Sequence, residues 1–116
     1  MKPKVLFIVE SDPRNSGRPA EAIRVAAGVG TWKKAEIHLH LRGAAILGLG
    51  EWVDDLVDED NFTRYLPIVG ESGEPVTVET GSPFVADLGT SAIPHTPITA
   101  DQLAALAAQS SSVLRF

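Results

Sequence analysis

The sequence predicts a single α/β domain, a three-layer α/β/α sandwich built around a five-stranded, mostly parallel sheet. The chain opens with an apolar run, Val5–Val9, which breaks at once into a Pro/Gly/Asn loop and then an alanine-rich segment. Further on, short apolar runs alternate with segments of helical periodicity, which is typical of β-α-β units. A chain of 116 residues has room for one hydrophobic core, so residues 1–116 are expected to form one domain.

The first strand is expected over Lys4–Glu10, and its almost continuous apolar character indicates burial on both faces. A helix should follow near Pro19, because proline suits a first helical turn and the carboxylate of Glu21 complements the helix dipole there. Apolar residues recur along this helix at spacings of three and four, which predicts a stripe that faces the core. The stripe consists of Ala22, Val25, Ala26 and Val29.

The second strand is expected over residues 35–41, where apolar and polar side chains alternate strictly. Ile37, Leu39 and Leu41 point to one face, and Glu36, His38 and His40 point to the other. One polar face predicts either an edge strand or a face that a second subunit covers. Residues 43–50 are small and glycine-interrupted, which favours a short helix.

The segment 51–60 carries six carboxylates and no basic residue, so removing it from the net charge of −5 leaves +1 on the rest of the chain. Aromatic and apolar residues from Phe62 to Val69 have helical spacing, but Pro67 should kink or restart that helix. A turn is expected at 71–75, a strand at 75–79, a short helix at 82–89 and an extended segment at 90–97.

The last helix has the clearest start signal, because Thr99 and Gln102 have the spacing of a capping box ahead of Leu103, Leu106 and Ala107. The helix should end near Ser110. Val113–Phe116 then reads as the final strand.

Composition excludes several classes of function. A net charge of −5 without a basic stripe argues against a nucleic-acid partner. Since the chain contains no cysteine, it has no disulfide, thiolate metal site or cysteine nucleophile. Val5–Val9 is too short for a signal peptide or membrane span, which predicts a cytoplasmic protein with no membrane association.

Four stretches resemble the DsrE/DsrF-like family of small α/β proteins, which includes TusD-like sulfur-relay subunits and has a flavodoxin/Rossmann-like architecture. These are the opening strand with Ser11-Asp12-Pro13, the helix around 21–26, the turn at Gly43, and the ending from Gln102-Leu103 through Val113-Leu114-Arg115-Phe116. The family's sulfur carriers hold a persulfide on a cysteine after the third strand. That position falls here at about Glu79 or Thr80, so this chain cannot carry a persulfide.

The resemblance implies a homo-oligomer, with a trimer or hexamer expected, or else a hetero-oligomer with paralogues. It favours an oligomeric, non-catalytic module that binds a small ligand or a protein. Open α/β proteins bind ligands in the crevice at the carboxyl ends of the strands. The predicted ligand-binding residues there are Asp12, Arg18, Arg42, Glu79, Thr80 and Ser82. Arg14, Arg18 and the backbone amides of the helix start would hold a small anion, and no cofactor is expected.

Three alternatives stay open from the sequence. His38 and His40, with Glu36, have a spacing that two imidazoles and a carboxylate can use to share a metal ion. The acidic run 51–60 suits a solvated face or a docking surface for a basic partner better than a calcium loop, because it lacks the calcium-loop spacing. Finally, a small hydrolase or transferase would use histidine or carboxylate acid–base chemistry at the strand-end crevice or at a subunit interface.

Overall fold

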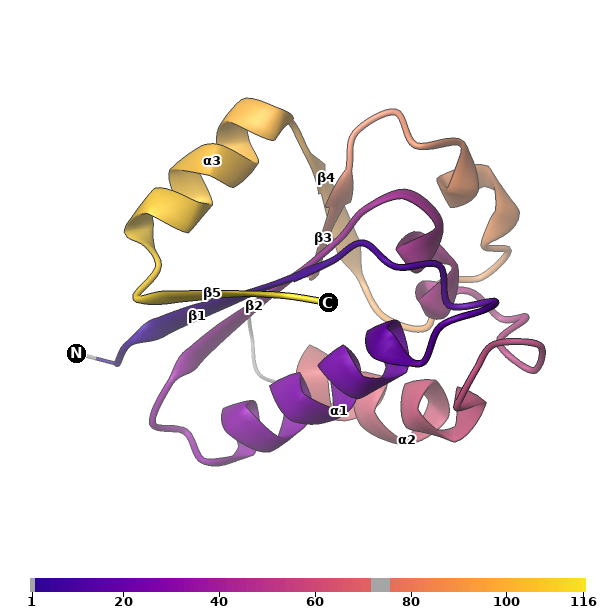
Figure 1. Ribbon diagram of the computed structural model, residues 1–116, viewed down its shortest axis with the longest axis horizontal. Helices are drawn as coiled ribbons and strands as arrows, with labels where there is room; N and C mark the ends of the chain where they lie inside the picture. Colours follow the sequence, from indigo (N-terminus) through magenta and orange to yellow (C-terminus); the bar gives the residue numbers. More distant parts are fainter. Residues whose placement is uncertain (1, 72–75) are drawn as a thin grey trace.

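The computed structural model describes residues 2–71 and 76–116 and contains one parallel sheet of five strands in the order β4-β3-β2-β1-β5 (Figure 1). In chain order the elements are β1 (Lys4–Val9), α1 (Arg18–Thr31), β2 (Glu36–Leu41), the 3₁₀ helix η1 (Gly43–Leu49), α2 (Glu59–Gly70), β3 (Val76–Glu79), the 3₁₀ helix η2 (Pro83–Asp87), β4 (His95–Ile98), α3 (Ala100–Gln109) and β5 (Ser112–Arg115). The predicted turn at 71–75 lies outside the described residues except for Glu71.

The helices form two layers because the chain reverses direction across the sheet once. The connections from β1 to β4 all step the same way, and right-handed crossovers therefore place α1 and α2 on one face. The connection from β4 to β5 runs back across the sheet and places α3 on the opposite face (Figure 1). The predicted three-layer α/β/α sandwich is confirmed.

The core lies between the sheet and the α1/α2 layer. Phe7 and Val9 of β1 and Leu39 of β2 are buried against both helices, together with Phe62 and Leu66 of α2. On α1 the buried side is formed by Pro19, Ala20, Ala22, Ile23, Ala26 and Ala27. Val25 and Val29, which the periodicity placed in the core stripe, only pack at its margin. The helix is turned so that its alanines face the core, which leaves the larger valines half-buried.

Strand β2 is not an edge strand, and that alternative is wrong. It lies between β1 and β3 in the middle of the sheet. Its polar residues point to the α3 face, where His40 is only 1% exposed. Strict alternation misled the prediction because a hydrogen-bonded histidine can be buried. The His40 Nδ1 atom lies 2.8 Å from the hydroxyl of Thr77, 37 residues away on β3.

Helix α2 continues through Pro67 to Gly70 without the predicted restart. Pro67 lies in the last turn of the helix, and Thr63, whose carbonyl loses its partner, is exposed to water. Within the described residues, no helix is both long and apolar enough to cross a membrane.

The capping box at the start of α3 is present as predicted. The Thr99 hydroxyl accepts a hydrogen bond from the Gln102 backbone amide at 3.1 Å, and the Gln102 side chain accepts one from the Thr99 amide at 2.7 Å. Helix α3 buries none of its own residues, so it depends on this cap more than a core helix does.

We expect Thr99→Ala to lower the free energy of unfolding by about 1 kcal/mol, because it leaves the first amides of α3 without their acceptor. Urea denaturation of the two proteins measures the difference. Thr90→Ala is the matched control, since Thr90 is exposed and should change stability by less than about 0.5 kcal/mol. Equal stabilities for the two variants would contradict a stabilising role of the cap.

Candidate functional site

Four charged side chains meet at the carboxyl ends of the strands, and we call Glu10, Arg42, Glu79 and Arg115 the strand-end cluster. Glu10 Oε1 lies 2.9 Å from Arg115 Nη1 and 3.3 Å from Arg42 Nη1. Arg42 Nη2 lies 3.5 Å from Glu79 Oε2. The cluster therefore links β1, β2, β3 and β5 by alternating charges and carries no net charge of its own.

The parallel register produces this cluster. Each member ends or directly follows a strand, and the four strands are neighbours in the sheet. Gly43 adopts a φ of +53°, which lets the chain turn immediately after Arg42 and directs the Gly43 amide to Glu79 Oε1 at 3.2 Å. The predicted residues Arg42 and Glu79 are thus brought together.

Glu10 and Arg115 were missed by the sequence analysis. The available signal was that each is a charged residue at the end of an apolar strand, the same signal that identified Arg42 and Glu79. In a parallel sheet all such positions converge at one edge.

The loop between β1 and α1 is stabilised by the carboxylate of Asp12, which bonds to another residue of the same loop. Asp12 accepts hydrogen bonds from the Arg14 amide at 2.9 Å and from the Arg14 guanidinium at 2.8 Å. The hydrogen bond from the Arg14 side chain lowers the pKa of Asp12. Arg14 also lies over the Phe84 ring at 5.7 Å, which ties this loop to η2.

Arg18 occupies the opposite side of the strand ends. Its Nη2 donates to the Arg115 carbonyl at 3.0 Å, and its guanidinium lies 5.9 Å from the centre of the Phe116 ring. Among the described residues, no carboxylate lies within ion-pair distance of Arg18. Arg18 is exposed, so its positive charge is available to a ligand.

Thr80 and Ser82 lie at the same edge but make local contacts. The Thr80 amide donates to the Ile98 carbonyl at 3.1 Å, which extends the pairing of β3 with β4. The Ser82 hydroxyl accepts from the Phe84 amide at 3.3 Å and caps η2. No described contact joins either residue to Asp12, Arg18 or Arg42. Thr80 and Ser82 therefore lie at the periphery of the candidate site.

His40 lies beneath the strand-end cluster, inside the α3 face of the sheet. Burial lowers the pKa of His40 to about 4, and the nearby Arg42 guanidinium adds to this effect. The Thr77 hydroxyl can donate to the Leu39 carbonyl at 3.4 Å, which leaves it to accept from an Nδ1–H of His40. At neutral pH the ring is therefore an uncharged imidazole fixed in one tautomer.

The metal alternative gains no support within residues 2–71 and 76–116, where no three histidine, aspartate or glutamate side chains are grouped closely enough to hold an ion. His38 and His40 do share the α3 face of β2, and His38 Nε2 lies 3.6 Å from Glu36 Oε2.

Most residues of the acidic run 51–60 are exposed. Within this run, the Glu51 carboxylate accepts a hydrogen bond from the Thr90 backbone amide at 2.8 Å.

Protonation of His40 should destabilise the protein in mildly acidic solution. The unfolded chain takes up this proton near pH 6.5 and the folded chain only near pH 4, so the stabilisation is complete above 6.5 and is lost between those values. The loss should reach about 3 kcal/mol at most.

Urea unfolding as a function of pH measures that loss. His40→Asn, which keeps an N–H group near the Nδ1 position, should remove most of the slope between pH 6.5 and 4 whatever its own stability. An unchanged slope in His40→Asn would assign the acid sensitivity to other groups.

The comparisons with known proteins found a similar fold but no similar sequence. No protein-family model matches the chain, and no curated protein matches it in sequence. Among solved structures, the ychN protein from E. coli superposes over 100% of both chains with a TM-score of 0.81 and 17% sequence identity. At that identity the likeness concerns the backbone arrangement alone. The chain therefore has a DsrE-like α/β fold, with a five-stranded parallel sheet and three α-helices.

Proposed function

We propose that this protein is a non-catalytic, homo-oligomeric binding module of the DsrE/DsrF-like family, in which the strand-end site takes a small anion or a protein partner. A sulfur-carrier role is excluded by chemistry. The chain has no cysteine, and Glu79 and Thr80 stand about where the family's persulfide cysteine would be. A carboxylate or a hydroxyl cannot hold a persulfide.

The observation that carries self-association is an apolar surface that this chain leaves uncovered. Helix α3 is built mainly from alanine and leucine, and Ala104, Ala105 and Ala108 are exposed. Beside it, all four residues of β5 are exposed. Val113, 40% exposed, pairs with Leu6 on the α3 face, and Leu114, 41% exposed, pairs with Phe7 on the other face of this edge strand. We call these exposed residues of α3 and β5 the α3/β5 surface. A helix that is apolar on nearly all sides is stable in water mainly when another surface covers it.

A second copy of this chain is the occupant that the surface favours. Strands β4 and β5 form the two edges of the sheet. Pro97 in β4 lacks an amide hydrogen and so disfavours pairing with another strand, whereas β5 contains no proline. Asp101 is the sole charged residue of α3, so little electrostatic repulsion opposes the approach of an identical helix. The family resemblance implies a trimer or a hexamer for the assembly.

The ligand-binding part of the proposal rests on Arg18. Asp12 and the strand-end cluster pair their charges internally, whereas Arg18 adds a positive charge beside the start of α1. The Arg18 amide donates to the Ser16 hydroxyl and Pro19 has no amide hydrogen, so the Arg18 guanidinium and the helix dipole are what favour an anion here. Arg42 and Glu79 would form one wall of this site, and Thr80 and Ser82 its far edge.

The competing proposal is a small hydrolase or transferase that uses His40 as a base. A neutral imidazole with a fixed tautomer suits that role, but His40 is 1% exposed and a substrate cannot reach it without a change in the surrounding structure. An enzyme of this kind should lose roughly 100-fold or more of its activity when the base is removed. The binding module should instead lose affinity.

Native mass spectrometry should show multiples of the 12.3 kDa chain. Ala105→Glu places a charge on exposed α3 and should raise the subunit dissociation constant at least about tenfold, because a desolvated, unpaired charge is costly at an interface. Ile68→Glu is the matched control, since Ile68 is 38% exposed on α2 across the sheet and should leave the assembly intact. A monomeric parent protein, or an Ala105→Glu variant that assembles unchanged, would contradict self-association through α3.

Phosphate should raise the melting temperature of the parent protein by about 6 °C more than that of Arg18→Ala, at a concentration roughly ten times the dissociation constant. Differential scanning fluorimetry measures the shift. Arg64→Ala controls for general salt effects, because Arg64 is an exposed guanidinium on α2, away from the strand ends. Equal shifts in all three proteins would restrict Arg18 to a structural role.

A further inference from the structure

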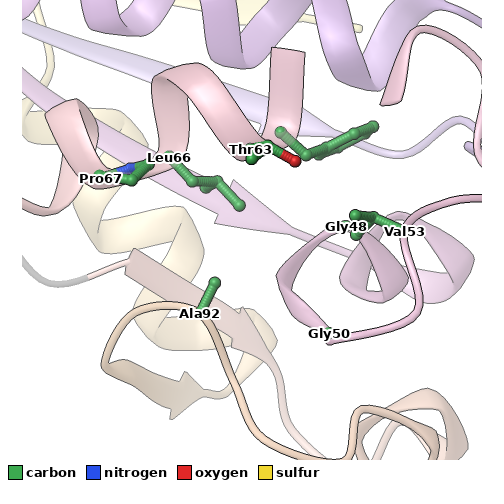
Figure 2. A pocket seen from close by; sticks show the side chains of 8 residues that line it. Gly48, Gly50, Val53, Thr63, Leu66, Pro67 and Ala92 are labelled. Atoms are coloured by element: carbon green, nitrogen blue, oxygen red, sulfur yellow. The ribbon is translucent and has the colours of Figure 1, made fainter. Parts of the chain in front are cut away.

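An apolar hollow lies on the α1/α2 side of the sheet, away from the strand-end cluster. It has a volume of about 210 Å³ and opens between η1, α2 and the loop before β4 (Figure 2). Phe62 and Leu66 form its buried wall, while Thr63, Pro67 and Ala92 lie at its exposed rim. In Figure 2, Leu66 and Ala92 point from opposite sides toward the same space.

Two glycines that line the hollow allow the backbone to pack closely against its neighbours there. A Cβ atom on Gly48 would lie 2.5 Å from the Phe62 ring, and one on Gly50 would lie 3.0 Å from the Leu88 carbonyl oxygen. Both glycines are buried, so the backbone itself lines this part of the hollow. The packing of Phe62 therefore requires that no side chain be present at position 48.

The lining chemistry limits what can bind. Among the described residues, Thr63 contributes the one polar side chain of the lining, and none of the lining residues is charged. Nearby backbone amides are already used, since the Ala92 amide donates to the Leu49 carbonyl at 2.7 Å and the Gly50 amide to the Leu47 carbonyl at 3.1 Å. A charged ligand would lose its hydration without gaining a partner.

The volume limits the size of the ligand. An engineered apolar cavity of about 150 Å³ accommodates benzene, whereas pockets for larger ligands begin at about 300 Å³. A volume between these two holds roughly six to ten non-hydrogen atoms. One hydroxyl on such a molecule would match the single threonine hydroxyl.

We infer that this hollow is a binding site for a small uncharged molecule of single-ring size that carries at most one hydroxyl group. The site goes beyond the proposed anion site, because it is formed by other elements and selects against charge. Its ligand meets Phe62, Leu66 and Pro67 through apolar contacts, and Thr63 supplies the one hydrogen bond.

Phenol and benzoate are the paired probes, because they have similar size and differ in charge at neutral pH. Backbone amide shifts in ¹H–¹⁵N NMR locate the binding. Phenol should bind with a dissociation constant on the order of 0.1–1 mM and perturb residues 48–53, 62–67 and 92. Benzoate should bind this hollow at least tenfold more weakly.

Benzoate that perturbs only residues near Arg18 would support the strand-end anion site and leave the inference about the hollow intact, so the two proposals can fail separately. No phenol shifts up to 10-fold above the expected dissociation constant, or equally tight binding of both probes at the hollow, would overturn the inference.

Variants at the rim provide the second test. Ala92→Leu should fill the opening and weaken phenol binding at least tenfold, whereas Ala86→Leu on exposed η2, outside the hollow, should leave it unchanged. Thr63→Val should weaken phenol binding a few-fold and leave toluene binding unchanged. Phenol binding that is insensitive to Ala92→Leu would overturn the inference, because the ligand would then lie elsewhere.

Discussion

The rest of the structure depends on the parallel pairing of β1 with β2 on one side and with β5 on the other. This pairing sets the composition of the core and the position of the candidate site. It buries Phe7 and Val9 in the core that holds α1 and α2, and it points Leu6 and Ile8 toward α3. It also aligns the strand ends, so charged residues that are up to 105 positions apart in sequence become neighbours. Since neighbouring carboxylates and guanidiniums neutralise one another there, four charges can stand side by side at the end of an apolar sheet.

The two faces of the sheet meet different physical demands. On the α1/α2 face, alanines of α1 allow close packing, and Phe62 and Leu66 of α2 join the same core. On the α3 face, β2 presents His38 and His40 in place of aliphatic residues. The buried His40 ring is uncharged and hydrogen-bonded to Thr77, so protonation of the imidazole lowers the free energy of unfolding of the protein. Helix α3 covers this face without burying any residue of its own, which is why its outer side can interact with another surface.

Much of the fold was readable from local pattern, and the errors share one cause. Apolar runs located the strands, and the spacing of Thr99 and Gln102 located the start of α3, because these signals depend on residues close in sequence. The position of β2 was misjudged because alternation reports that one face is polar but not which strand pairs beside it. That pairing joins residues far apart in sequence, such as His40 and Thr77, which are hydrogen-bonded across 37 positions. At the candidate site, Arg42 and Glu79 were found from their places at strand ends, while Glu10 and Arg115 were not singled out as site residues. The hollow could not be foreseen, because its lining comes from η1, α2 and the loop before β4, which only the tertiary structure brings together.

The placement of the two proposed sites relative to the α3/β5 surface gives them different relations to assembly. Arg115 belongs to β5 and Arg18 donates to its carbonyl, so subunits that meet along β5 would bring the anion site close to the neighbouring chain. Where the neighbouring chain adds contacts to the anion, the anion favours the assembled state, since a ligand stabilises the form that binds it more tightly. The hollow lies between η1, α2 and the loop before β4, on the opposite face of the sheet from α3, and such an assembly leaves its mouth open to solvent. Binding of an uncharged molecule should therefore be independent of subunit association, whereas binding of an anion should be coupled to it.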